Sequence, residues 1–87
     1  MMNKLELFIT QTCPFCLRVL DVVAQEYPQN TIAIVDLNEE PEKAKLHYQT
    51  TGRYTVPCLY IDGNPLFESM DIIGYLIKNK NNILNQD

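Results

Sequence analysis

The sequence predicts an α/β protein whose strands and helices follow one another in the order βαβαββα. Three observations carry this prediction. Apolar residues recur over 14–27 with the spacing of an amphipathic helix. Those of 31–37 form an uninterrupted β-branched run, which is typical of a strand covered on both faces. A turn signal at 62–65 indicates a hairpin. We therefore expect a four-stranded mixed sheet with helices on both faces.

The first 37 residues predict a strand, a helix and a second strand. An apolar run at 5–9 predicts the first strand. The helix over 14–27 has its polar residues opposite its apolar stripe, and Pro28 stops it. With the strand over 31–37, these elements predict a βαβ unit whose two strands are parallel.

A weaker helical pattern covers 42–50. Ala44 and Tyr48 are expected to face inward, and Gly52 is expected to end the helix. His47 is predicted to be a solvated helix residue, because no partner for a catalytic imidazole is evident.

The last third of the chain predicts a hairpin and a helix. A strand over 55–61 begins at a proline, a turn follows at 62–65, and a short strand covers 66–67. Ser69 is predicted to cap the last helix, in which Gly74 is expected to allow close packing. The buried stripe of that helix is predicted to consist of Met70, Ile73, Leu76 and Ile77.

Length and composition predict one domain over 1–80, followed by a polar, frayed tail over 81–87. The net charge of −4 and the lack of a Lys/Arg cluster disfavour a nucleic-acid partner. No apolar run reaches the length of a membrane span, and the N-terminus lacks the pattern of a signal peptide. We therefore expect a cytoplasmic monomer that does not bind membranes.

The stretch Cys13-Pro14-Phe15-Cys16 lies where the first strand gives way to the first helix. We expect Cys13 at the N-cap and Pro14 at the first helical position, where its missing N–H has no cost. The amides of Phe15 and Cys16 would then point at the Cys13 sulfur and favour its thiolate form. This placement predicts redox chemistry, with Cys13 as nucleophile and Cys16 as resolving thiol.

The cysteines also permit other interpretations. A lone C-x-x-C could form half of a zinc site, but tetrahedral ligation would require His47 and Cys58 to converge on the pair, so we expect no metal. Cys58 is either a third thiol close to Cys13 or a small buried hydrophobic residue, and the second reading is favoured. Phe15 is expected to be an exposed apolar contact for partners. Arg53 is either a surface residue or a contact for a carboxylate.

Three motifs together resemble the glutaredoxin branch of the thioredoxin fold. They are the Cys-Pro-Phe-Cys stretch at 13–16, Thr-Val-Pro at 55–57 and the start of the last helix at 68–73. The sequence from Pro57 to Leu76 is most similar to the N-terminal domain of glutathione-transferase-like glutaredoxins. We expect this chain to be a stand-alone catalytic domain. The chain departs from many members at Thr10, where they have lysine, and at Met70, where they have aspartate.

This resemblance implies a glutathione-dependent thiol–disulfide oxidoreductase. Its substrates would be glutathionylated proteins and disulfide-containing proteins, and glutathione would be the co-substrate. Cys13 would attack the substrate and Cys16 would resolve protein mixed disulfides. The residues implied in glutathione binding are Pro14, Phe15, Val56, Pro57 in a cis-proline loop, Glu68, Ser69 and Met70.

Three other functions remain open from the sequence. A glutathione transferase-like domain would conjugate electrophiles, although two thiols exceed what conjugation needs. An iron–sulfur carrier would share a cluster between two chains through Cys13 and glutathione, and Pro14 argues against that function. A thioredoxin-type protein would be served by a flavoenzyme without glutathione.

Overall fold

A computed structural model of the chain describes residues 4–85. Within them, four strands form one mixed sheet in the order β2-β1-β3-β4. β2 is parallel to β1, whereas the β1–β3 and β3–β4 pairs are antiparallel. The strands are β1 (Leu5–Ile9), β2 (Ala33–Asp36), β3 (Cys58–Ile61) and β4 (Asn64–Phe67).

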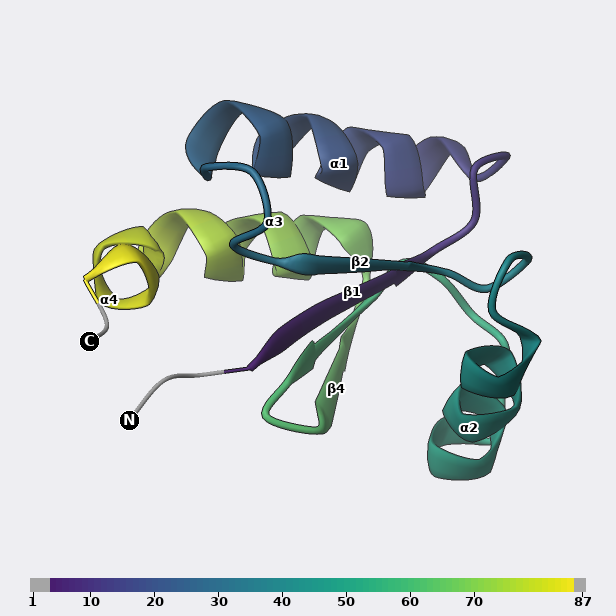
Figure 1. The fold of residues 1–87 in the computed structure, drawn as a ribbon. Coiled ribbons are helices and arrows are strands. Elements are labelled where there is room, and N and C mark those ends of the chain that lie inside the picture. The colour runs from purple at the N-terminus through teal and green to yellow at the C-terminus, as the bar shows by residue number, and fades with distance from the viewer. Residues whose placement is uncertain (1–3, 86–87) are drawn as a thin grey trace.

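The helices cover both faces of this sheet, which confirms the predicted fold class. Figure 1 shows α1 and α3 side by side on one face, and α2 on the other. None of the described helices combines the length and apolar character needed to cross a bilayer. The helices are α1 (Pro14–Glu26), α2 (Pro41–Thr51), α3 (Ser69–Lys78) and α4 (Lys80–Leu84).

Alternation along β1 divides the buried residues into two clusters, because successive side chains of a strand point to opposite faces. Leu5, Leu7 and Ile9 pack beneath α1 and α3, in the larger cluster. Phe8 points to the α2 face, where it packs with Tyr60 and other buried residues. The sheet therefore separates a main core from a smaller core that underlies α2.

The β3–β4 hairpin turns at Asp62 and Gly63, which both have positive φ (51° and 87°). This is the backbone of a type I′ turn, which matches the twist of the two strands and favours Asp-Gly. β4 begins at Asn64 and includes Pro65, so it is longer than the predicted strand over 66–67. A proline is tolerated there because β4 is an edge strand.

The second strand differs from its prediction. β2 is shorter than 31–37 and lies at the other edge of the sheet, and Ala33 and Ile34 are exposed. The prediction that both of its faces would be covered was therefore wrong at these two positions. An apolar run predicts strand formation, but the neighbours that cover a strand depend on its position in the sheet.

The buried face of α2 also differs from its prediction. His47 is fully buried and Tyr48 is 46% exposed, so both expectations were wrong. The Tyr48 ring stacks instead on the exposed Tyr54, with centroids 4.7 Å apart. Burial of the imidazole is tolerated because both of its nitrogens have hydrogen-bond partners.

The start of α3 is displaced by one position, and its buried stripe agrees with the prediction only at Leu76 and, partly buried, at Ile73. Glu68 is the N-cap and Ser69 is the first helical residue, so the prediction that Ser69 caps the helix was wrong. Met70 (67%) and Ile77 (56%) are exposed, whereas Ser69, Ile72 and Leu76 are buried. Apolar residues cover a wide arc of this helix, so periodicity alone leaves its orientation open.

Two smaller expectations were also wrong. A Cβ atom at Gly74 would meet nothing within 4 Å, so this glycine does not serve close packing. Residues of the expected frayed tail form α4, and Ile83 is buried in the main core. Lys80 pairs with Glu26 at 3.1 Å and ties α4 to the end of α1. The last two residues of that tail lie outside the described residues.

The burial of Ile83 predicts that α4 contributes to stability. Ile83→Ala should lower the free energy of unfolding by about 2–4 kcal/mol, because it leaves a cavity in the main core. Leu84→Ala is the matched control: Leu84 is 37% exposed, and its effect should stay within about 0.5 kcal/mol. Urea denaturation measures both, and equal effects would show that α4 does not pack as described.

Candidate active site

The Cys13 sulfur lies at the N-terminus of α1. Cys13 is the N-cap, with φ −91° and ψ 114°, and Pro14 is the first helical residue, as predicted. The Cys16 N–H donates to the Cys13 Sγ at 3.2 Å. The helix start thus directs a backbone N–H donor at this sulfur.

Cys16 lies one helical turn further on and is fully buried. Burial raises the pKa of its thiol to about 12, and its hydrogen bond with Cys13 and the charges of Cys13 and Asp36 add to the rise. A backbone hydrogen bond at Thr10 partly opposes them. The two thiols are therefore unlike: Cys13 is partly exposed, and Cys16 is buried and protonated at neutral pH.

A cavity of about 210 Å³ opens beside the start of α1. Three separate segments form it: the first turn of α1, the loop before β3 and the junction between β4 and α3. The Val56–Pro57 peptide bond in the loop is cis. The Cys13 thiol donates a long hydrogen bond to the Val56 carbonyl oxygen, with sulfur and oxygen 3.8 Å apart. The lining residues are Phe15, Thr55, Val56, Pro57, Glu68 and Ser69.

The third wall of the cavity ends in the first turn of α3. The N–H groups of that turn have no partners within the helix, and such a helix start attracts anionic groups. Glu68, just before it, has φ 73° and ψ 122°, a backbone conformation that glycine adopts far more readily. Ordinary small glutaredoxins, which this sequence resembles, carry a glycine pair at this point of the chain.

The structure brings together most, but not all, of the residues implied in binding. Phe15 is 56% exposed, in agreement with its prediction. Pro14 shapes the start of α1 but does not line the cavity, and neither does Met70, whose side chain is largely exposed. Thr55 lines the cavity and was missed as a site residue, although it directly precedes the Val-Pro pair.

The remaining candidates lie away from the cavity lining. Cys58 is fully buried in β3, as favoured, and burial raises the pKa of its thiol to about 11. The Arg53 guanidinium lies over the Phe67 ring, 4.3 Å from its centroid. Over residues 4–85, no three His, Cys, Asp or Glu side chains gather as a metal site would need.

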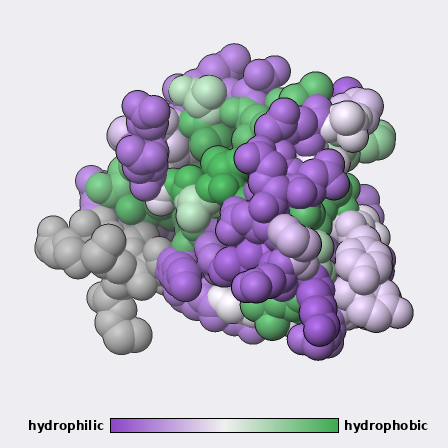
Figure 2. Space-filling view, turned by 45° about the vertical axis from the view of Figure 1, so that its right-hand side comes forward, coloured by the Kyte–Doolittle hydropathy of each residue, from purple (hydrophilic) through white to green (hydrophobic). Residues whose placement is uncertain are grey.

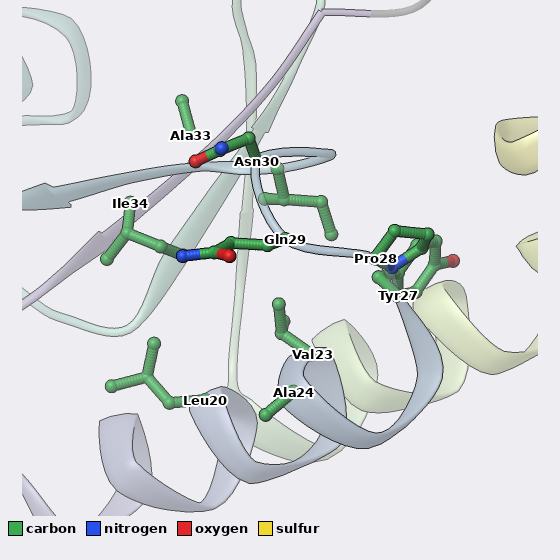
Figure 3. A pocket seen from close by; sticks show the side chains of 10 residues that line it. Leu20, Val23, Ala24, Tyr27, Pro28, Gln29, Asn30, Ala33 and Ile34 are labelled. Atoms are coloured by element: carbon green, nitrogen blue, oxygen red, sulfur yellow. The ribbon is translucent and has the colours of Figure 1, made fainter.

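A wider groove of about 710 Å³ lies between α1 and the segment that leads into β2. Figure 3 shows Leu20, Val23 and Ala24 of α1 facing Gln29 and Ile34 across it. No residue in its lining carries a thiol or a charge. Figure 2 shows that hydrophobic residues reach the surface of the molecule between hydrophilic ones. The partly exposed Cys13 lies instead next to the smaller cavity's lining residue Val56, whose carbonyl oxygen is 3.8 Å from its sulfur.

The family model "Glutaredoxin" matches residues 5–66, from β1 into β4, and the match includes the C-x-x-C pair and the cis-proline loop. The chain belongs to the glutaredoxin family. A glutaredoxin of the thioredoxin fold is, in the broad sense, a thiol–disulfide oxidoreductase, which agrees with two unlike thiols at a helix start.

Individual proteins agree with this assignment. Glutaredoxin-1 of variola virus and of vaccinia virus are each 30% identical to the chain, over 86% of this chain and 81% of the viral protein. A trimeric glutathione transferase of Leishmania is 36% identical over 86% of this chain, with a TM-score of 0.66, but the chain spans only 16% of its length. Oxidised glutaredoxin 2 of Chlamydomonas reinhardtii shares the fold at 20% identity, with a TM-score of 0.66 over 94% of this chain and 79% of that one.

The burial of two thiols predicts selective alkylation. In the reduced native protein at neutral pH, iodoacetamide should modify Cys13 alone, because only thiolates react. Cys16 and Cys58 are buried, and their thiols have pKa values near 12 and 11. Peptide mass mapping after a short exposure checks this, with urea-unfolded protein as the control that labels all three. Modification of Cys16 at a rate equal to that of Cys13 would contradict the described geometry.

Proposed function

We propose that this glutaredoxin uses glutathione as co-substrate to reduce mixed disulfides between proteins and glutathione, and also protein disulfides. One observation carries the proposal: the Cys13 sulfur lies 3.8 Å from the carbonyl oxygen of Val56, which lines a small cavity together with Ser69 at the start of α3. Glutathione is a tripeptide with an anionic carboxylate at each end, so it suits such a cavity.

Each wall has a counterpart in the tripeptide. The Val56 N–H and C=O would pair with the cysteinyl backbone of glutathione, as neighbouring strands pair. The start of α3 and the Ser69 hydroxyl would receive the γ-glutamyl carboxylate. The resemblance to a Leishmania protein described as a glutathione transferase supports glutathione as the ligand.

The first reaction needs only Cys13. Its thiolate attacks the glutathione sulfur of a glutathionylated protein, and the protein thiolate leaves and takes up a proton. This forms a Cys13–glutathione disulfide. The thiolate of a second glutathione attacks the glutathione sulfur of that adduct, releases the Cys13 thiolate and forms oxidised glutathione. The protein thiol is thus reduced at the expense of one glutathione thiol, and the glutathione that came from the substrate leaves joined to the second glutathione as one disulfide.

Protein disulfides require both cysteines. Cys13 attacks one sulfur of the substrate disulfide, and the Cys16 thiolate then attacks the Cys13 sulfur of the mixed disulfide. The substrate leaves as a dithiol and a Cys13–Cys16 disulfide remains. Two glutathione molecules reduce this bond in turn. The charge of Cys13 and its hydrogen bond raise the pKa of the Cys16 thiol, so the mixed disulfide, which removes that charge, favours ionisation of Cys16 at the step that needs it.

Single cysteine variants test the proposal. Cys13→Ser should abolish turnover of a glutathionylated peptide, because the nucleophile is lost. Cys16→Ser should keep that turnover but lose reduction of protein disulfides. After exposure to oxidised glutathione, intact mass spectrometry of Cys16→Ser should show one added glutathione, which peptide mapping should place on Cys13. Turnover by Cys13→Ser, or an adduct elsewhere, would refute the assignment.

The two routes should also respond differently to pH. Burial is the largest cause of the raised pKa of the Cys16 thiol, and it persists in the mixed disulfide, so the thiolate fraction of Cys16 should still rise with pH there. The rate of protein-disulfide reduction, divided by the rate of deglutathionylation, should therefore rise between about pH 6 and about pH 9. The ratio cancels the Cys13 step that both routes share. A flat ratio would show that Cys16 ionisation does not control the dithiol route.

Conjugation of electrophiles is a second candidate, favoured by the 36% identity with the Leishmania transferase. An aryl halide assay with glutathione distinguishes it from disulfide exchange. Conjugation without turnover of a glutathionylated peptide would replace the proposal made here.

A further inference from the structure

His47 is the buried polar side chain that the proposed reaction leaves unused. It lies on α2, is fully buried and is surrounded by rings, with centroids 5.4 Å from Phe8, 5.6 Å from Tyr60 and 5.8 Å from Phe67. A buried polar ring among aromatic neighbours is costly unless its nitrogens are bonded, so the partners of the imidazole indicate its role.

Both ring nitrogens have partners. Nε2 lies 2.8 Å from the Thr55 carbonyl oxygen and Nδ1 lies 2.7 Å from the Tyr60 hydroxyl oxygen. A carbonyl oxygen only accepts, so Nε2 carries the hydrogen and donates. In the neutral ring Nδ1 then accepts from the Tyr60 hydroxyl. The Thr55 carbonyl thus selects the tautomer, and the Tyr60 hydroxyl of β3, which can donate or accept, satisfies the other ring nitrogen.

The loop that His47 binds is a wall of the cavity. The Thr55 carbonyl is turned towards His47, whereas the next carbonyl, that of Val56, lies 3.8 Å from the Cys13 sulfur. His47 and the Cys13 thiol therefore contact two successive carbonyl oxygens and hold the loop from opposite sides. The Thr55 carbonyl and the Val56 N–H belong to the same planar peptide unit, so fixing this carbonyl also fixes the direction of the Val56 N–H.

Few other contacts hold α2 against the sheet. Its backbone makes few close approaches to the other elements, in agreement with its outlying place in Figure 1. Its described ion pair joins Lys43 and Glu6 at 3.6 Å and is partly exposed, so it contributes little. The buried hydrogen bonds of His47 are thus a main tie between α2, β3 and the loop.

We propose that His47 is a positioning residue of this oxidoreductase, which holds the Thr55 carbonyl and so keeps the loop at 55–57 in the conformation that receives the glutathione part of the substrate. Tyr60 assists by satisfying the other ring nitrogen of His47. The inference rests on the proposed function, since it assigns the loop to glutathione recognition.

Three variants test it by steady-state kinetics with a glutathionylated peptide. His47→Leu retains the volume and loses the donor, so KM for the peptide should rise about tenfold while kcat stays within about twofold. In His47→Gln the side-chain amide N–H can reach the Thr55 carbonyl, so KM should stay within about threefold of the wild-type value. Tyr60→Phe keeps the ring and leaves the His47 Nδ1 without its partner, which weakens the hold of the imidazole, and KM should rise about threefold.

Cys13 alkylation by iodoacetamide should proceed at the wild-type rate in all three variants, because the hydrogen bond from the Cys16 N–H is untouched. Equal KM values for His47→Leu and the wild type would overturn the proposal. Equal increases for His47→Leu and His47→Gln would also overturn it, because they would show that packing matters and the donor does not. If His47→Leu does not fold, the KM of Tyr60→Phe decides.

A measurement without turnover separates this inference from the proposed function. Nitrogen NMR of the wild-type imidazole should show the proton on Nε2, because the Thr55 carbonyl only accepts. A wild-type ring protonated on Nδ1 alone would refute the hydrogen bond from His47 to the Thr55 carbonyl, whatever the activity. If wild-type protein did not turn over the glutathionylated peptide, the proposed function would fail, while the NMR result would still test the contact between His47 and Thr55.

Discussion

The site depends on one backbone hydrogen bond, from the Cys16 N–H to the Cys13 sulfur at 3.2 Å. This bond forms because Cys13 has an extended backbone while the residues after it are helical. It makes the two cysteines unequal: the first is partly exposed and receives a donor, and the second is buried within the helix. The chemistry proposed for each follows from that difference.

The sheet converts this local arrangement into a site. β1 delivers the start of α1 to one end of the sheet, and the antiparallel pairing of β3 with β1 brings the loop before β3 to the same end. The antiparallel β4 then returns the chain there, at the start of α3. Segments around Phe15, Val56 and Ser69, far apart in the sequence, therefore line one cavity.

The smaller core has a part in this arrangement as well. Most of its members are apolar, but His47 and Tyr60 introduce hydrogen bonds that reach the loop. Buried polar groups are costly unless satisfied, and a satisfied pair specifies one geometry more narrowly than apolar packing does. This explains how a lightly attached α2 can still influence the site.

Local chemistry determined what the sequence alone could predict. The type and order of the elements follow from periodicity, the turn at Asp62 and Gly63 follows from its residues, and the cap at Cys13 follows from the cysteine–proline pair. These features depend on neighbours within a few residues. The family resemblance rested on the same short motifs.

Only the tertiary structure decided which sides of those elements are buried. The predicted stripes of α2 and α3 were displaced, because each helix offers several apolar residues and its orientation is set by the elements it contacts. Exposure of Ile34 depends on the edge position of β2, and burial of Ile83 depends on the packing of α4 against the core. The role of His47 could not be predicted for the same reason: its partners, Tyr60 and the Thr55 carbonyl, approach it only when the chain has folded.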